Sequence, residues 1–186
     1  MLKKILILSF LLGSAAAYAQ VAPSVRGGES SLWAGGMFSS FDPDFDNTSR
    51  VLGLGVWADY NVTHRFGAQA EARWMHWNGA GQQTQSNYLL GPTVRVFQFH
   101  QFSLNAKFVL GGVWIKFPAS VDASGSYFGY APGGYVDYHI SHSRFSVRGD
   151  YEYQFLPSAP GLGGPSHGLN PHGFSVGVSY RILGIQ

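Results

Sequence analysis

The histidines, and the serines beside one pair of them, come nearest to a catalytic or metal-binding pattern in this 186-residue chain. His139 and His142 are three positions apart, and Ser141 and Ser143 flank the second. A metal site needs three or four ligands with supporting partners, and no cysteine or carboxylate cluster accompanies these histidines. A serine nucleophile needs a base within hydrogen-bond reach and an oxyanion site, which adjacency alone does not supply. We therefore predict no catalytic residue, no metal and no cofactor.

A short acidic run offers a second possible site. Asp42, Asp44 and Asp46 occupy alternate positions, as ligands do in a calcium loop. The glycine and the distant glutamate of a calcium-binding helix-loop-helix are missing. A solvated acidic loop is therefore favoured, with weak cation contact or repulsion of like-charged surface sugars as alternatives.

Ten charged residues share one face of a set of alternating segments, because successive side chains on a strand point to opposite faces. They are Asp59, Glu71, Asp137, Asp150 and Glu152, and the basic residues Arg73, Arg95, Lys107, Arg148 and Arg181. The opposite faces carry no charge away from the segment ends. An unpaired buried charge is costly, so equal numbers of each sign predict a narrow interior in which the charges pair. A selective pore is the alternative, but the side chains of a small barrel fill its interior, which favours a plug.

Strand register predicts two contacts within this set. Counting across the short turn between the sixth and seventh segments puts Asp137 almost opposite Arg148, which predicts a cross-strand ion pair. Glu71 should approach Arg95 on a diagonal across the third and fourth segments. Pro92 lies in the fourth segment and lacks a backbone N–H, so we predict a bulge there.

Eight segments of roughly ten residues carry the alternation. They are approximately residues 31–41, 51–60, 66–77, 88–96, 102–114, 128–140, 145–155 and 173–182. The connections alternate between short and long, and the long ones, rich in Gly, Ser, Asp, Asn and Pro, are residues 42–50, 78–87, 118–126 and 157–171. An outer-membrane barrel alternates in this way, with short periplasmic turns and long external loops. The longest connection suits a mobile surface segment.

Aromatic residues on the uncharged faces separate into two levels. Those near the short turns are Tyr60, Phe66, Phe102, Tyr138, Phe145 and Tyr180, and those near the long loops are Phe38, Trp74, Tyr88, Trp114, Tyr130, Tyr153 and Phe174. Leu, Val and Ala occupy the middle. Two aromatic girdles around an apolar band are typical of a membrane-spanning barrel.

The first residues predict secretion. Lys3 and Lys4 precede an apolar run over residues 5–12 and a cleavage site at residues 17–19, so residues 1–19 are predicted to be a signal peptide cut after Ala19. Residues 20–30 would form an N-terminal periplasmic segment and residues 31–186 the barrel. Without cysteine there is no lipid attachment point and no disulfide. Removing Lys3 and Lys4 balances the remaining charges at ten of each sign, which gives no basic patch for nucleic acid.

The last segment carries the most specific resemblance. Ser175, Gly177, Tyr180 and Ile182 form a pattern similar to the terminal-strand signal of the small eight-stranded outer-membrane barrels typified by OmpA-like and OmpX-like proteins. That family commonly ends on an aromatic residue, whereas residues 183–186 follow here. The resemblance implies a single closed eight-stranded antiparallel up-and-down transmembrane β-barrel of the all-β class. It also implies contact with outer-membrane lipid and lipopolysaccharide, and with the barrel-assembly machinery during insertion.

Together these features predict a protein of the bacterial outer membrane with a structural or surface-interaction role. A narrow or transient pore for small solutes is one alternative. A lipid-modifying barrel enzyme is another, since some members of the resembled family are enzymes. A soluble secreted β protein is the main alternative to membrane insertion.

Overall fold

A computed structural model describes residues 30–44, 50–78, 83–116, 124–159 and 168–184. Eight β-strands account for most of these residues. They are β1 (Ser31–Asp42), β2 (Val51–Asn61), β3 (Phe66–Trp77), β4 (Thr84–Phe99), β5 (Phe102–Lys116), β6 (Ser124–His139), β7 (Phe145–Tyr153) and β8 (His172–Leu183). Within the described ranges, no helix is long and apolar enough to cross a membrane.

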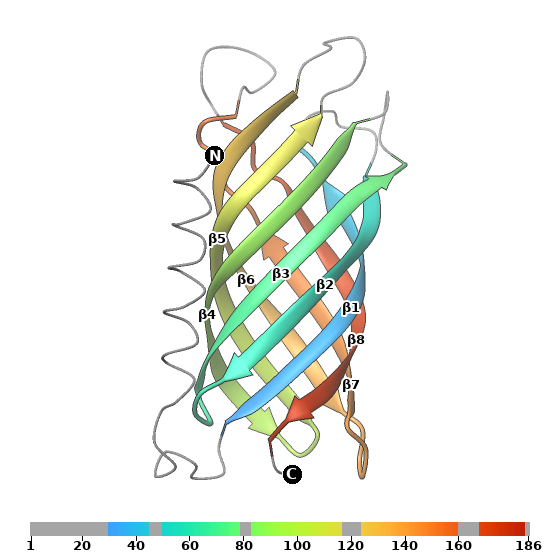
Figure 1. The fold of residues 1–186 in the computed structure, drawn as a ribbon, viewed down its shortest axis with the longest axis vertical. Helices are drawn as coiled ribbons and strands as arrows, with labels where there is room; N and C mark the ends of the chain where they lie inside the picture. Colours follow the sequence, from blue (N-terminus) through green and yellow to red (C-terminus); the bar gives the residue numbers. More distant parts are fainter. Residues whose placement is uncertain (1–29, 45–49, 79–82, 117–123, 160–167, 185–186) are drawn as a thin grey trace, which may run out of the picture.

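The strands form a closed antiparallel barrel in which each strand pairs with its neighbours in sequence and β8 pairs with β1. Closure is continuous around Met37, which pairs with Gly55 of β2 on one side and with Gly177 of β8 on the other. Figure 1 shows the strands tilted in one sense around the barrel. The turns over residues 62–65, 100–101 and 140–144 lie at the end where β8 finishes. The predicted closed eight-stranded barrel is confirmed.

The two faces of the wall place apolar side chains outside and charged side chains inside, the reverse of a soluble protein. Phe66 and Val176 on the outer face are 59% and 55% exposed, whereas Arg73 and Glu152 on the inner face are fully buried. Charged side chains are rarely buried completely unless they are paired, and a continuous exposed apolar surface marks a contact with lipid or protein. The wall therefore matches a barrel that faces lipid outward and encloses polar groups.

Aromatic side chains contact one another at both ends of the outer face. At the short-turn end, Phe145 and Tyr180 have ring centroids 5.2 Å apart. At the opposite end, Tyr88 lies 6.1 Å from Trp74 and 5.3 Å from Trp114, again between centroids. These contacts join neighbouring strands laterally, as in the two predicted girdles.

β4 differs from the prediction in two respects. It begins at Thr84, inside the expected loop, and continues to Phe99. The predicted bulge at Pro92 is wrong, because Pro92 pairs in register with Ala68 and the register of β4 against β5 is the same on both sides of it. The flanking pairs hold the register, so the missing N–H removes ladder bonding without shifting the strand. The irregularity falls instead between Arg95 and Phe97.

Candidate functional site in the barrel lumen

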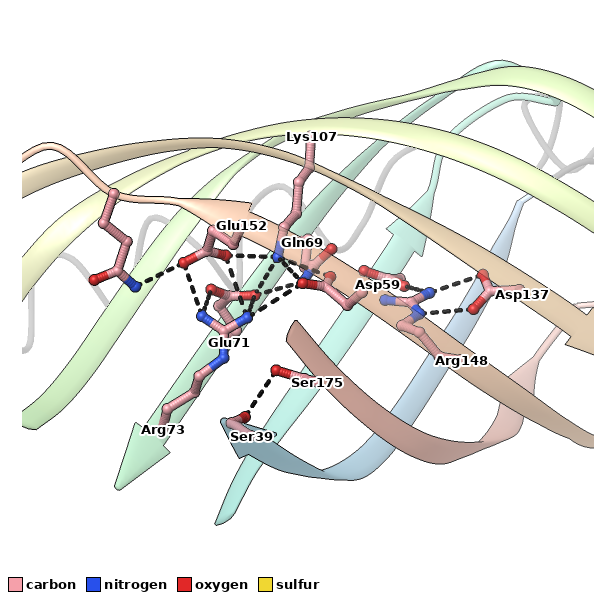
Figure 2. A network of polar contacts seen from close by, with 12 residues as sticks. Ser39, Asp59, Gln69, Glu71, Arg73, Lys107, Asp137, Arg148, Glu152 and Ser175 are labelled. Atoms are coloured by element: carbon pink, nitrogen blue, oxygen red, sulfur yellow. Dashed lines mark hydrogen bonds and ion pairs between the residues drawn. The ribbon is translucent and has the colours of Figure 1, made fainter. Parts of the chain in front are cut away.

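Five charged residues meet in the middle of the lumen in a group that we call the central cluster: Glu71, Arg73, Lys107, Asp150 and Glu152. Lys107 Nζ lies 3.0 Å from Glu71 Oε2, 2.9 Å from Asp150 Oδ2 and 2.7 Å from Glu152 Oε2. Arg73 contacts the same three carboxylates, at 2.7 Å to Glu71, 2.8 Å to Glu152 and 3.6 Å to Asp150. Figure 2 shows both cations pointing into this ring of carboxylates. Each carboxylate thus contacts both cations.

Strand alternation explains why these residues meet. Glu71 and Arg73 are two positions apart on β3, as are Asp150 and Glu152 on β7, so each pair shares the inner face. β3, β5 and β7 are not neighbours in the barrel, so the contacts among them cross the interior. Gly133 makes room for Lys107, since a Cβ at this glycine would lie 2.9 Å from Lys107 Cε.

Amide side chains donate further hydrogen bonds to the carboxylates of the central cluster. Gln69 Nε2 donates to Glu71 Oε2 at 2.7 Å, and Gln154 Nε2 donates to Glu152 Oε1 at 2.7 Å. Gln85 continues the chain of hydrogen bonds by donating to Gln154 Oε1 at 2.9 Å and to Asn87 Oδ1 at 3.0 Å. A buried ionic group is tolerated when its remaining lone pairs are satisfied in this manner.

A second group, the Arg148 triad, comprises Arg148, Asp59 and Asp137. Arg148 Nε donates to Asp137 Oδ1 at 2.6 Å and Nη2 donates to Asp137 Oδ2 at 2.8 Å, a two-point contact across β6 and β7. The same Nη2 donates to Asp59 of β2 across the lumen. The guanidinium carbon lies 3.7 Å from the Tyr135 ring centroid and 4.9 Å from that of Trp57. The ion pair expected between Asp137 and Arg148 is present (Figure 2).

Trp57 fits beside Arg148 because two neighbouring inner positions are glycine. A Cβ at Gly35 of β1 or at Gly177 of β8 would lie 2.6 Å from carbons of the Trp57 ring. Gly177 also approaches the Gly36 carbonyl oxygen of the adjacent strand more closely than a Cβ permits. Part of the small-residue pattern in the last strand therefore has a packing cause.

Replacing Gly177 with alanine should destabilise the folded barrel by about 1–3 kcal/mol, because the new methyl group overpacks the lumen against Trp57. The midpoint of urea unfolding in detergent, followed by tryptophan fluorescence, measures the change. Gly149→Ala is the matched control, since nothing lies within 4 Å of a Cβ at that outward position. Equal midpoints for the two variants would contradict the packing explanation.

Arg95 and Arg181 are inward, but the structure does not bring them into either charged group. Arg95 Nη1 donates to Gln98 Oε1 at 3.1 Å, and the Arg181 guanidinium carbon lies 5.3 Å from the Trp33 ring centroid. The predicted approach of Glu71 to Arg95 is wrong. Glu71 pairs in register with Leu89, so Arg95 lies six residues further along β4, at the short-turn end.

An apolar layer lies beyond the central cluster, towards the long-loop end. It consists of Leu89, Val109, Val113, Ile115, Ala131, Leu156, Ala159 and Leu169, with Tyr127 packed against it. Leu156 N donates to Leu169 O at 2.9 Å, and Leu169 N donates back to Leu156 O at 3.2 Å. A Cβ at Gly129 would lie 2.5 Å from Leu156 Cδ2, which places this leucine against the inner wall of β6.

The apolar layer corrects the prediction for residues 157–171. That connection was expected to be a mobile surface segment, whereas Ala159 and Leu169 within it are 1% exposed. Residues 160–167 lie outside the described part of the chain. The missed signal was a loss of alternation at Leu89–Leu90, residues 108–110 and residues 113–115, where apolar residues occupy both faces. Apolar residues on both faces of a strand indicate an apolar interior at that level.

The serines and histidine that first suggested chemistry lie at the turn between β6 and β7. Ser141 Oγ accepts a hydrogen bond from Gln101 Nε2, and Ser143 Oγ accepts one from Phe145 N at 3.1 Å. Among the described residues, no group of three or more His, Cys, Asp or Glu side chains could hold a metal ion.

The acidic run after β1 is only partly described. Asp44 Oδ2 accepts from Asn170 N at 2.9 Å, and Asp44 N donates to Asp42 Oδ1 at 3.1 Å. Asp46 lies outside the described residues. The contact with Asn170 ties the end of β1 to the chain that leads into β8.

Comparison with known proteins gives a consistent result. The sequence model of a family described as "Outer membrane protein beta-barrel domain" matches residues 5–181. No curated protein matches the chain. The N-terminal β-barrel domain of Pseudomonas aeruginosa OprF is similar in structure, with a TM-score of 0.55 at 13% identity over 83% of this chain and 100% of that one.

Two further solved structures have the same architecture. Neisserial surface protein A, NspA, has a TM-score of 0.55 at 11% identity, covering 81% of this chain and 96% of that one. Ail, the attachment invasion locus protein of Yersinia pestis, has a TM-score of 0.50 at 18% identity, covering 83% and 99%. At these identities the similarity establishes the fold.

Proposed function

This chain belongs to the outer membrane protein beta-barrel domain family, and from that membership we propose a non-enzymatic barrel with a structural or surface-interaction role and a lumen closed by its own side chains. Membership in the family implies the bacterial outer membrane. A closed wall is stable in lipid because closure pairs the strand backbones and leaves no open sheet edge.

The observation that carries the closed lumen is the set of ion pairs that cross it. Arg73 on β3 contacts Glu152 on β7, and Arg148 on β7 contacts Asp59 on β2. These strands are not neighbours, so each contact spans the interior. The apolar layer adds a third obstruction in series towards the long-loop end. To cross the lumen, a solute would have to separate the ion pairs of the central cluster and of the Arg148 triad, and would also have to displace the apolar layer.

The surface-interaction role is supported by the connections at the long-loop end and by analogy. Ail, a barrel of this fold, is named for attachment and invasion and has been crystallised with the heparin analogue sucrose octasulfate. NspA is named a surface protein. We propose by analogy that the long connections of this chain face outward, and that its apolar band contacts outer-membrane lipid and lipopolysaccharide.

Fractionation combined with gel mobility tests membrane insertion. A folded barrel in detergent should run at a different apparent mass from the boiled sample and should be recovered with outer membranes. A heat-independent band in the soluble periplasmic fraction would instead support the soluble alternative. N-terminal sequencing of the recovered protein tests the proposed cut after Ala19, which would leave residues 20–30 as a periplasmic segment before the barrel at 31–186.

We further propose that Ser175, Gly177, Tyr180 and Ile182 act as a signal to the barrel-assembly machinery. Ser175 Oγ lies 2.8 Å from Ser39 Oγ, and Gly177 packs on Trp57, so both also serve the folded lumen. Tyr180 and Ile182 point outward and are 41% and 49% exposed. These two residues are therefore the ones whose assembly role can be separated from packing.

The double variant Tyr180→Ala/Ile182→Ala should lower the amount of barrel in the outer membrane of cells, yet refold in detergent nearly as well as the unaltered chain. Immunoblots of membrane fractions and heat-dependent gel mobility after refolding measure the two effects. Phe174→Ala/Val178→Ala on the same outward face of β8 is the control, since it also removes one aromatic and one aliphatic side chain but lies outside the signal. Equal losses in cells for both pairs would argue against the signal.

Catalysis on lipid is the remaining alternative. Mass spectra of lipid A from cells with and without the protein should be identical under the proposed role. A trimmed or added acyl chain that depends on the protein would overturn it.

A further inference from the structure

A cavity of about 310 Å³ lies at the short-turn end of the barrel, which we call the vestibule. The starts and ends of several strands and all three short turns contribute to its lining. Six of the lining residues are cationic or can become so: Arg95, Arg181, His64, His100, His139 and His142. Among the described residues that line it, none is Asp or Glu. The vestibule is therefore rich in basic side chains, and among the described lining residues no carboxylate lies there to neutralise Arg95 or Arg181.

The five inward carboxylates are all engaged deeper in the lumen. Three contact Arg73 and Lys107 in the central cluster, and two contact Arg148. Within the described part of the chain, no carboxylate lies within 4.0 Å of Arg95 or Arg181. The inward charges therefore balance in number but separate in space. The two deep groups have five acids for three bases, and the vestibule holds the two remaining bases.

Two buried nitrogens of vestibule residues have no hydrogen-bond partner among the described residues. They are Arg95 Nε and His139 Nδ1. The other sides of these residues are held, by Gln98 at 3.1 Å from Arg95 Nη1 and by Ser103 at 3.4 Å from His139 Nε2. His139 also packs against Trp33, with ring centroids 5.1 Å apart. The Arg95 and His139 side chains are thus held in place before any ligand arrives, which lowers the entropy cost of binding.

We propose that the vestibule binds a phosphate-type oxyanion, with Arg95 and Arg181 as the principal contacts. The planar guanidinium group donates two parallel hydrogen bonds to phosphate oxygens, a geometry that lysine cannot reproduce. The aromatic contact of Phe145 with Tyr180 marks this end of the wall as the interfacial level, where lipid headgroups lie. The same chemistry is offered by a free phosphate ester in the periplasm and by an anionic phospholipid headgroup.

Titration of the refolded full-length barrel with inorganic phosphate and with glycerol phosphate tests the proposal, using calorimetry in neutral detergent at constant ionic strength with chloride as the reference. Native mass spectrometry with phosphatidylglycerol, compared with phosphatidylcholine, tests the lipid source. Saturable binding of either phosphate or phosphatidylglycerol is expected for the unaltered chain. Absence of both would overturn the proposal.

The decisive comparison uses two charge-matched pairs of substitutions. Arg95→Gln/Arg181→Gln should weaken the observed binding about tenfold or more, the effect of losing charged hydrogen bonds. Arg65→Gln/Arg144→Gln removes the same charge from exposed turn positions at the same end, outside the vestibule lining, and should leave binding unchanged. Equal weakening by both pairs would mean nonspecific surface attraction and would contradict the site.

A conservative pair protects the test against misfolding. Arg95→Lys/Arg181→Lys keeps both charges but loses the guanidinium fork, so it should weaken binding less than the glutamine pair and more than the turn pair. Heat-dependent gel mobility establishes that each variant is folded before titration. If both the lysine and the glutamine double variants bound the anion as tightly as the unaltered chain, the anion would bind elsewhere and the assignment would be overturned.

Discussion

Replacing Lys107 with methionine should destabilise the folded barrel by about 3–5 kcal/mol, the range for removing one partner of a buried charge pair. Lys107 Nζ lies within 3.0 Å of three carboxylates, and its side chain is fully buried. Without it, Glu71, Asp150 and Glu152 would share Arg73 alone. The methionine fills a similar volume, so the loss reports the charge rather than a cavity. Urea unfolding in detergent, followed by tryptophan fluorescence, measures it.

A second substitution separates charge from packing. Lys107→Met/Glu152→Gln removes one base and one acid, so it should recover part of the stability lost by Lys107→Met alone. Lys116→Met is the control at an exposed position at the far end of the same strand, and it should change stability little. Two results would contradict the central cluster as described. One is a stability loss for Lys107→Met no larger than that for Lys116→Met. The other is a double variant less stable than Lys107→Met alone.

Replacing Arg148 with alanine should increase ion leak through the folded barrel. The change removes the guanidinium that joins β7 to Asp59 across the lumen and leaves Asp59 and Asp137 without their cation. It also leaves space beside Trp57 and Tyr135, whose rings the guanidinium contacts. Conductance in planar bilayers measures the leak, with heat-dependent gel mobility to show that the variant is folded.

The apolar layer lies in series with the Arg148 triad, so the two obstructions should act together. Arg148→Ala/Leu156→Ala should leak more than either single variant, because Leu156 packs against Gly129 in the half of the lumen nearer the long loops. Arg144→Ala at the exposed short turn removes the same charge outside the lumen and should leave conductance unchanged. A folded Arg148→Ala barrel that leaks no more than the Arg144→Ala control would contradict the triad as an obstruction.

The fold could be predicted because the strands of a membrane barrel alternate apolar and polar residues with a period of two. Gln69, Glu71 and Arg73 point inward, and the alanines that alternate with them, at positions 68, 70 and 72, point outward, so alternation alone assigned the two faces. The pairing of Asp137 with Arg148 was equally accessible, because a short turn fixes the register on both sides of it. Both predictions rest on local sequence.

What lay beyond prediction depends on contacts across the lumen. The positions of Glu71 and Lys107 in the sequence do not predict that charged side chains of β3, β5 and β7 meet. Such a meeting depends on the tilt and stagger of the strands in the barrel. The predicted contact of Glu71 with Arg95 failed for a separate reason. The strands β3 and β4 are neighbours, but the long connection between them does not fix their register, which puts Leu89 opposite Glu71. The vestibule, likewise, is assembled from turns that are distant in sequence.

The apolar layer escaped prediction for a different reason. Glycine and proline around residues 157–171 are typical of a surface loop, and composition cannot show that a loop folds inward. Leu156 and Leu169 pair in an isolated β-bridge inside the barrel. They belong to the same buried apolar cluster as Val109 and Val113 on the inner face of β5. The inner apolar residues of β4 and β5 were the only local indication.

The central claim is that this eight-stranded barrel is closed by its own side chains. Conductance of the unaltered protein in planar bilayers, after refolding is verified by heat-dependent gel mobility, tests it most directly. We predict no sustained conductance above the bare bilayer for the unaltered protein, and a measurable conductance for the Arg148→Ala/Leu156→Ala variant. A stable open level from the unaltered barrel would contradict the account and favour a pore.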